Sequence, residues 1–254
     1  KLSKLDQNMA KKYISSFSTA IYSVWNEKNR EKIEGLVVSD SVIINTTDTT
    51  SRSLEQLLDI IEKICKTEFT ANGILMRGAI AKGEFDKIEA KELSTLSKGL
   101  IVGQAYVDAY LLEGTVKTIG IVLSEDVFKD IQQINLQSNN IVEERSTSEK
   151  NFILKYLDID FLLEDVNLRN YINLARNSNW LPHYYNTLYF AMKNEKSEKK
   201  VLKTFSKIIG LIDENNDSSN WREVDTFIKK AFDNNVIAHF QMRFLKYIRM
   251  NITE

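Results

Sequence analysis

The chain has 254 residues, of which 43% are hydrophobic and 27% are charged, a composition typical of a globular protein with one large core or two smaller ones. Its 34 basic residues nearly balance 35 acidic ones, and the net charge of -1 gives no broad positive field for binding nucleic acid or an anionic membrane. The longest apolar runs, such as 119–123, are far shorter than the roughly 20 residues of a membrane-spanning helix. We therefore expect neither a nucleic-acid partner nor a membrane span.

The chain contains one cysteine, Cys65, and two histidines, His183 and His239. A single cysteine cannot form an intrachain disulfide or a thiolate-rich zinc site, so we expect a reducing, cytoplasmic compartment. Cys65 follows Ile61 and Ile64 at helical spacing, which predicts a buried small hydrophobic side chain. The histidines are expected to serve structure or the surface, because His183 lacks the nearby acidic residue of a zinc-binding helix motif.

The first half of the chain alternates between helical and strand patterns. Apolar residues recur every three to four positions over 9–25, which predicts an amphipathic helix. Two β-branched runs within 35–45 flank Asp40 and predict a hairpin that turns there. Ser53 is placed to cap a second helix that ends near Gly73. The later predictions are a strand over 74–85, a polar loop over 86–98, an apolar segment over 99–103, a helix over 104–113, a strand over 118–123 and a short helix after Ser124.

The order of these elements predicts a mixed α/β domain over residues 1–135. Residues 136–150 are polar and serine-rich, so we expect a linker or surface loop there. We expect a second, mainly helical domain over 151–254, with its aromatic clusters in a core. Helical spacing recurs in this part of the chain over 181–192, 201–212, 224–232 and 236–250.

Asp40 is the first candidate for chemistry, because the predicted hairpin places its carboxylate at a tip on the edge of a sheet. A carboxylate in that place can hold a divalent metal. Magnesium takes one or two carboxylates together with phosphate oxygens, so a second acidic residue should lie on an adjacent strand. The alternative is that Asp40 only shapes the turn, since aspartate is a favoured turn residue.

A second group of candidates lies on the predicted strand over 74–85 and at the start of the helix over 104–113. Arg77 is a candidate phosphate clamp, and Gly78 would let a ligand approach the backbone closely. The helix after Gly103 begins at Gln104, and its first N–H groups would face an anion. Gly78, Gly103 and Gln104 are therefore candidates for contact with an anionic ligand such as a nucleotide.

Three segments occur in a specific order: the hairpin over 37–44, the strand over 75–85, and the stretch 103–113 followed by the strand over 118–123. Together they resemble the class III nucleotidyl cyclase family, in particular the divergent bacterial branch that includes pyrimidine cyclases of anti-phage signalling. The resemblance covers about residues 1–128. It implies a ferredoxin-like α+β core that binds a nucleoside triphosphate with two metal ions on two aspartates. Those metals activate the ribose 3′-hydroxyl and neutralise the α-phosphate.

Position by position, the resemblance makes Asp40 the second metal aspartate, and we expect the strand with the first one upstream of residue 1. The family places an asparagine, and four residues later an arginine, on the helix after the glycine. Here these positions hold Val107 and Leu111. Neither side chain can orient a sugar or stabilise charge on phosphates, so Arg77 and Lys82 are the catalytic candidates that would supply positive charge instead.

The resemblance therefore implies a nucleotidyl cyclase-like protein with weak or lost cyclase activity, which takes Mg²⁺ or Mn²⁺ as cofactor and a nucleoside triphosphate as ligand. It also implies a homodimer and, for a role in anti-phage signalling, a separate effector protein as partner. Two alternatives stay open. The first alternative is an active cyclase that makes a cyclic mononucleotide. The second is a noncatalytic interaction scaffold.

Overall fold

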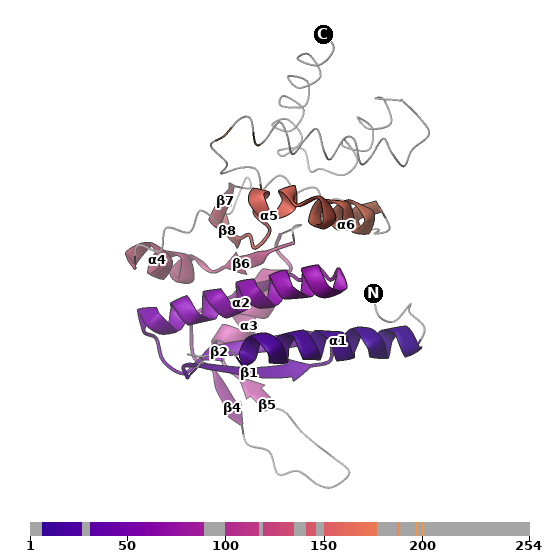
Figure 1. The fold of residues 1–254 in the computed structure, drawn as a ribbon. Coiled ribbons are helices and arrows are strands. Elements are labelled where there is room, and N and C mark those ends of the chain that lie inside the picture. The colour runs from indigo at the N-terminus through magenta and orange to yellow at the C-terminus, as the bar shows by residue number, and fades with distance from the viewer. Residues whose placement is uncertain are drawn as a thin grey trace. The chain divides into compact units, whose positions relative to one another are not determined.

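The computed structural model describes residues 7–26, 31–88, 100–116, 119–134, 141–145 and 150–176, together with positions 187, 191, 197 and 200. Helices and strands are interspersed along the described chain (Figure 1). The chain divides into two compact units, Lys1–Glu113 with Leu123–Gln137 and Gly114–Val122 with Ser138–Glu254. The described chain contains both helices and strands, so the mixed α and β content predicted from the sequence is confirmed.

The predicted hairpin is present in the first unit and consists of β1 (Ile33–Val38) and β2 (Ser41–Thr46). The two strands pair antiparallel, and their register leaves Ser39 and Asp40 as a two-residue turn. Ser39 has a φ of 58°, in the left-handed region that tight hairpin turns require. The two β-branched runs therefore pair with each other, and Asp40 stands at the turn as expected.

Helix α1 (Gln7–Trp25) confirms the amphipathic helix predicted at the start of the chain. Its last residue, Trp25, lies against Gly35 of β1, where an added Cβ would come within 2.8 Å of the indole Cζ3. The missing side chain at Gly35 thus makes room for the indole ring. The buried face of α1 consists of Phe17, Ala20, Ile21 and Val24.

Helix α2 (Ser51–Asn72) begins earlier than predicted, because Thr50 and not Ser53 is its N-cap. Thr50 is extended, with φ -76° and ψ 153°, and its hydroxyl accepts a hydrogen bond from the Ser53 N–H at 3.3 Å. Ser53 therefore stands inside the first turn. The predicted end is confirmed, since Gly73 caps the helix in the left-handed conformation at φ 64°.

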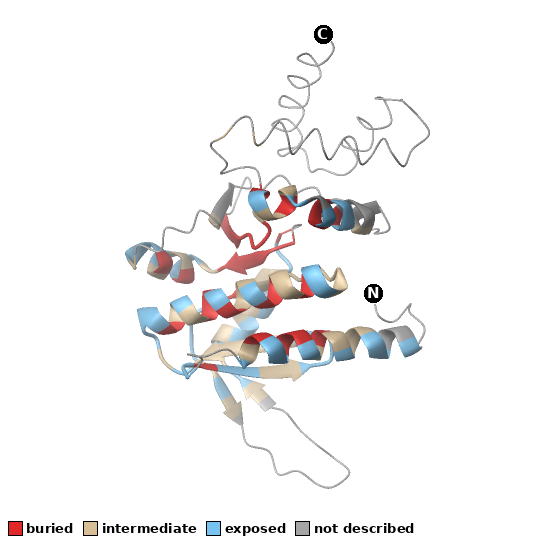
Figure 2. Cartoon of the chain, in the orientation of Figure 1, coloured by how far each residue is buried: buried red, intermediate tan, exposed pale blue. Residues whose placement is uncertain are grey.

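Helices α1 and α2 pack against each other and provide the core of the first unit. Figure 2 shows buried residues along one side of both helices and exposed residues along the other. Cys65 is buried, as predicted, and burial raises the pKa of its thiol, with further contributions from Glu62 and Glu68. The buried apolar residues of α2 are Leu57, Leu58, Ile60, Ile64, Cys65 and Phe69.

The region after α2 differs from the prediction. The strand expected over 74–85 is reduced to β3 (Gly78–Ile80). The segment expected as a polar loop contributes β4 (Asp86–Ile88), which pairs antiparallel with β5 (Leu100–Val102). Lys87 donates to the Glu34 carboxylate of β1 at 2.9 Å. A polar segment thus becomes a strand because an apolar partner strand and a charged neighbour are available to it.

Helix α3 (Gln104–Glu113) occupies the predicted residues. Strand β6 (Ile121–Leu123) is shorter than the strand predicted over 118–123. Helix α4 (Glu125–Gln133) follows it directly, and Ser124 is its N-cap, as predicted. Two acidic residues in its first turn favour the same start, because they face the positive end of the helix dipole.

In the second unit, β7 (Ile141–Arg145) pairs antiparallel with β8 (Lys150–Leu154), and the strands follow the order β6-β8-β7. Strand β7 lies within 136–150, the segment predicted as a linker. Its first two residues are β-branched, and pairing with the apolar end of β8 outweighs the polar composition around them. Helices α5 (Ile159–Leu163) and α6 (Asp165–Arg176) follow. The largest fully buried side chains of this unit include Tyr156, Tyr171, Ile153 and Leu157.

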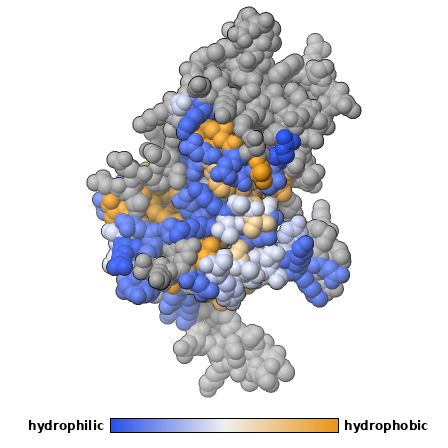
Figure 3. Space-filling model, viewed as in Figure 1, coloured by the Kyte–Doolittle hydropathy of each residue, from blue (hydrophilic) through white to orange (hydrophobic). Residues whose placement is uncertain are grey.

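The four helices predicted over 181–192, 201–212, 224–232 and 236–250 fall almost wholly outside the described residues. Among the helices that the structure describes, none is long and apolar enough to cross a membrane. Figure 3 shows that hydrophilic residues cover most of the described surface on the face in view, where hydrophobic residues form separate patches.

Candidate functional site

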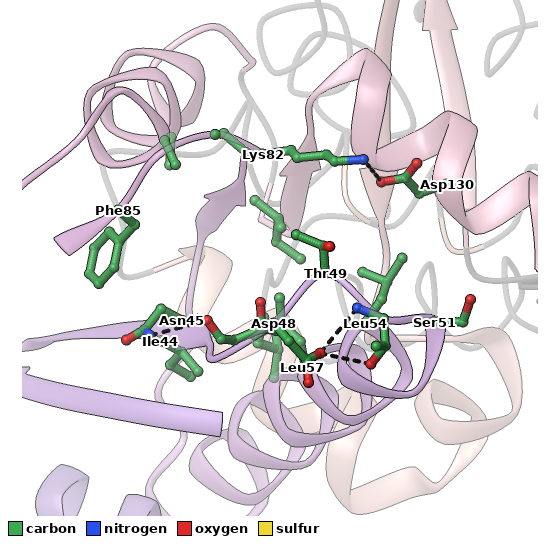
Figure 4. A pocket seen from close by; sticks show the side chains of 18 of the residues that line it. Ile44, Asn45, Asp48, Thr49, Ser51, Leu54, Leu57, Lys82, Phe85 and Asp130 are labelled. Atoms are coloured by element: carbon green, nitrogen blue, oxygen red, sulfur yellow. Dashed lines mark hydrogen bonds and ion pairs between the residues drawn. The ribbon is translucent and has the colours of Figure 1, made fainter. Parts of the chain in front are cut away.

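A cavity of about 320 Å³ lies within the first unit, and every residue that lines it belongs to the described chain (Figure 4). Strand β2, the N-terminal part of α2, the segment over 80–85 and helices α3 and α4 contribute to it. Much of the lining is apolar and includes Ile43, Leu54, Leu57, Ile61, Ile80 and Phe85. The polar lining includes Asn45, Asp48, Lys82, Asp130 and Gln133.

Asp48 lies beside the cavity, just before α2 begins (Figure 4). Its Oδ1 accepts hydrogen bonds from the Thr50 N–H at 3.1 Å, from the Thr50 hydroxyl at 2.7 Å and from the Ser53 hydroxyl. The Nζ of Lys32 lies 3.2 Å from its Oδ2. These bonds, with the Ser53 bond as the largest contribution, hold the pKa of the Asp48 carboxyl well below its usual range. The cavity therefore contains a carboxylate that is ionised and already hydrogen-bonded.

Lys82 and Asp130 form an ion pair beside the cavity, with 2.7 Å between Nζ and Oδ2 (Figure 4). Both side chains are partly exposed, so the pair contributes little to stability but compensates both charges. Asn45 differs from them. Its Nδ2 donates to the Thr46 carbonyl at 3.3 Å, whereas its Oδ1 is buried and accepts no hydrogen bond from the described residues.

Asp40 lies at the exposed turn between β1 and β2 and is not among the residues that line the cavity. Within the described part of the chain, no group of three or more histidine, cysteine, aspartate or glutamate side chains is arranged to hold a metal ion. Asp40 would therefore supply one ligand, and phosphate oxygens and water would have to supply the others. A magnesium ion accepts such a ligand set when a nucleotide is bound.

Arg77 is engaged with the C-terminal end of α3. Its Nη2 donates to the Glu113 carbonyl at 2.9 Å, and its Nε forms an ion pair with the Glu113 carboxylate. Gly78 follows as the first residue of β3. Neither residue lines the cavity, so the structure does not bring Arg77 and Lys82 together at that site.

Gly103 is required by the packing of the chain itself. It has a φ of 138°, and a Cβ there would lie 2.7 Å from the Phe85 Cα and even closer to the Glu84 carbonyl. Gln104 donates through Nε2 to the Asp108 carboxylate at 2.7 Å. The next N–H of α3, that of Ala105, donates to the Glu84 carbonyl at 3.2 Å. At least one N–H group at the start of α3 is therefore already hydrogen-bonded within the protein, and the predicted anion site has fewer N–H groups to offer.

Helix α3 presents two chemically different faces. Ala105 and Ala109 line the cavity. Val107, Tyr110 and Leu111 lie on the solvent side and have exposed fractions of 46%, 73% and 64%. We call these three residues the α3 outer face. Apolar side chains of this size are usually buried, and three of them on one short helix form an apolar surface that is available to a partner.

Sequence reasoning did not identify Asn45, Asp48 or Asp130 as site residues. The available signal for Asp48 was its position two residues before Thr50, a spacing typical of turns that lead into a helix. That signal indicates capping and says nothing of a cavity. Asp130 meets Lys82 only through the tertiary fold, because 48 positions separate them.

Comparison with known protein families, curated proteins and solved structures yields no match to this chain. The comparisons therefore assign no family.

Proposed function

We propose that the first unit is a nucleotidyl cyclase-like module that binds a nucleoside triphosphate with Mg²⁺ or Mn²⁺ and has weak or lost cyclase activity. The observation that carries the proposal is the α3 outer face, where Val107 and Leu111 occupy the positions at which the family places an asparagine and an arginine. Both side chains are exposed, and a substrate held at these positions would meet two aliphatic groups. They offer no hydrogen bond to it.

The metal is assigned to Asp40, because the confirmed hairpin leaves this carboxylate exposed at its tip. A divalent ion there would neutralise charge on the bound phosphates. Asp40 would hold the ion, and Gly78 and Gln104 remain the proposed nucleotide contacts. The site in this form is a binding site with one protein carboxylate, which favours attachment of a nucleotide over its chemical conversion.

Weak turnover follows from the cations as well. Arg77 is paired with Glu113, and Lys82 is paired with Asp130. A cation that already has a carboxylate partner must break that contact before it stabilises phosphate charge. Removing one preorganised donor from an active site typically reduces the rate about a hundredfold to a thousandfold. Two missing donors and two engaged cations are consistent with little cyclisation.

We further propose that the module forms a homodimer through the α3 outer face. In a two-fold symmetric pair, the same apolar surface would be covered on both copies. In anti-phage signalling, a separate effector protein would read the nucleotide-bound dimer. An active cyclase is the alternative proposal, and it requires Arg77 or Lys82 to leave its carboxylate partner.

Calorimetric titration of the full chain with Mn²⁺ and each of the four nucleoside triphosphates tests the binding. We expect Mn²⁺-dependent binding of at least one of them, and we expect Asp40→Asn to remove it. Ser41→Ala, an exposed neighbour in β2, is the matched control and should bind normally. Mass spectrometry of the same mixtures should show little or no cyclic nucleotide. Rapid formation of one would support the active cyclase, and titrations without binding would contradict the proposal.

A further inference from the structure

We propose that the cavity receives an extended segment of another polypeptide, which pairs as a β-strand with β2 on one side and with residues 80–83 on the other. The proposal does not depend on the proposed function, because neither Asp40 nor the α3 outer face lines the cavity. Among the described strands, β2 pairs with β1 alone. The second edge of β2 is therefore open to a further strand.

The cavity runs along this edge of β2 and not over one face of the strand. Successive side chains of a strand point to opposite faces, so a cavity over one face would be lined by every second residue. Here four consecutive residues, 43–46, line the cavity. Residues 80–83 line it as well, and Figure 4 shows Lys82 across the open space from Ile44. Main chain is thus available on two sides of the same cavity.

The outward main-chain groups of β2 have no partner strand. At the end of the β1–β2 ladder, the Thr47 N–H donates to the Lys32 carbonyl at 2.9 Å. In an antiparallel pair, residues that bond across the ladder alternate with residues whose N–H and C=O groups point away from it. In this register, Ile44 and Thr46 are outward residues. Among the described residues, the Asn45 Nδ2 donates to the Thr46 carbonyl at 3.3 Å, and none bonds to the Thr46 N–H or to the N–H and C=O of Ile44.

The opposite side of the cavity offers groups of the same kind. The Ile80 carbonyl, at the end of β3, accepts a hydrogen bond from the Ser124 N–H at 2.9 Å. In an extended chain, the main-chain groups of the next residue point the other way. That residue is Ala81, which lines the cavity and has no main-chain hydrogen bond with the described residues. A strand between β2 and Ala81 would therefore find main-chain partners along both of its edges.

The side chains around the cavity fit a strand with apolar residues at alternate positions. Leu54, Leu57 and Ile61 form an apolar stripe along α2, and this stripe lines the cavity. At 1.5 Å per helical residue the stripe is about 10 Å long, which is also about the length of four successive residues in a strand. The small side chains of Ala105 and Ala109 leave room beside α3. One face of an inserted strand would be covered by the stripe.

The main-chain groups identify the ligand as a peptide. A purely apolar molecule would cover the stripe but would shield the outward groups of β2 from water without giving them partners, which is unfavourable. An extended peptide carries N–H and C=O groups at the spacing of β2 and satisfies them, as peptides do when they add a strand to a sheet edge. Each strand that the structure describes already pairs with another strand, so the inserted segment comes from another polypeptide.

The test is calorimetric titration of the full chain with synthetic peptides that alternate threonine with valine, isoleucine or phenylalanine between terminal lysines. We expect at least one peptide to bind in the micromolar range. Two control forms of that peptide carry methyl groups on main-chain nitrogens, one form at the threonines and the other at the apolar residues. Each form loses the N–H groups of one edge, so each should bind at least about tenfold more weakly.

Amide hydrogen exchange followed by NMR identifies the edge that the peptide uses. In the chain alone, the amides of Ile43 and Asn45 should exchange slowly because they bond to β1, whereas those of Ile44 and Thr46 should exchange at least about tenfold faster. The bound peptide should slow exchange at Ile44 and Thr46 at least about tenfold. Slow exchange at these two residues without peptide would show that the edge is already paired and would overturn the proposal.

A proline substitution tests the same edge from the side of the protein. Ile44→Pro removes an outward N–H and no ladder bond to β1, so the folded variant should bind the peptide at least about tenfold more weakly. Val42→Pro is the matched control, because Val42 is also an outward residue of β2 but does not line the cavity. Circular dichroism shows whether both variants are folded, and the methylated peptides decide with the unchanged chain if they are not. The proposal is also overturned if no peptide binds, if either methylated form binds as tightly as its parent, or if folded Ile44→Pro binds normally.

Discussion

Arg77 donates to the main-chain carbonyl of Glu113 at 2.9 Å and pairs with the carboxylate of the same residue. One arginine thus joins the segment before β3 to the last turn of α3. The position suits a cation, because the carbonyl groups at a helix C-terminus carry partial negative charge. This geometry gives Arg77 a role in holding the fold, whatever it contributes to a nucleotide.

The first prediction follows from that contact. Arg77→Ala should lower the free energy of unfolding by about 1 to 3 kcal/mol, because it leaves a partly buried carboxylate and a helix-end carbonyl without this donor. Lys82→Ala removes a more exposed pair and should cost less than about 1 kcal/mol. Urea unfolding of both variants measures the difference. Equal stability of Arg77→Ala and the parent chain would contradict the structural role.

Gly103 gives the second prediction. Gly103→Ala should lower the free energy of unfolding by more than about 2 kcal/mol, because φ is 138° and the new Cβ would meet the backbone of Glu84 and Phe85. Gly83→Ala is the comparison, since its Cβ would lie 3.3 Å from the Ala105 nitrogen, a tight but tolerable contact. Thermal melts of the two variants should therefore rank Gly103→Ala as the less stable.

Local rules explain which elements the sequence predicts well. The hairpin around Asp40, the end of α2 at Gly73 and the start of α4 at Ser124 each depend on residues within a few positions of one another. Turn, C-cap and N-cap preferences act at that range. The buried position of Cys65 follows from helical spacing in the same way.

Long-range contacts explain the rest. Strand β4 arises from a polar segment that pairs with β5, and this pairing is not visible in the composition of β4 alone. The start of α2 is an exception, because its N-cap, Thr50, was not predicted although it depends on local hydrogen bonds with Asp48 and Ser53. The cavity joins five separate parts of the chain, so Asn45 and Asp130 carried no local signal of a site.

Glu68 provides the third prediction, on pH dependence. Its side chain is buried, and burial raises the pKa of its carboxyl, although hydrogen bonds from Asn72 at 3.3 and 3.4 Å partly oppose this. A carboxyl whose folded pKa lies above its unfolded pKa binds protons more tightly in the folded state. Its contribution to stability is therefore greatest below the unfolded pKa and decreases as the pH rises through the folded pKa.

Glu68→Gln should consequently raise the free energy of unfolding at neutral pH, by about 1 kcal/mol, and should flatten the decrease of that free energy as the pH rises above the usual carboxyl pKa of 4.5. Glu62→Gln on the same helix is the control, because it removes only a partly exposed ion pair with Lys66. Urea unfolding at a series of pH values measures both. If the free energy of unfolding depended more steeply on pH in Glu68→Gln than in the parent chain, the raised pKa of the Glu68 carboxyl would be contradicted.

The last prediction concerns the α3 outer face and self-association. Tyr110→Ser and Leu111→Ser should each raise the dimer dissociation constant at least about tenfold, because a two-fold interface loses the same apolar contact twice. Tyr22→Ser is the matched control, since Tyr22 is also a helical tyrosine and is 65% exposed, compared with 73% for Tyr110. All three positions are exposed, so the variants should keep their stability within about 0.5 kcal/mol. Sedimentation velocity at micromolar concentration, with and without nucleotide, measures the association. If the parent chain is a monomer throughout, or if Tyr22→Ser weakens the dimer as much as Tyr110→Ser does, then α3 is not the surface through which two copies meet.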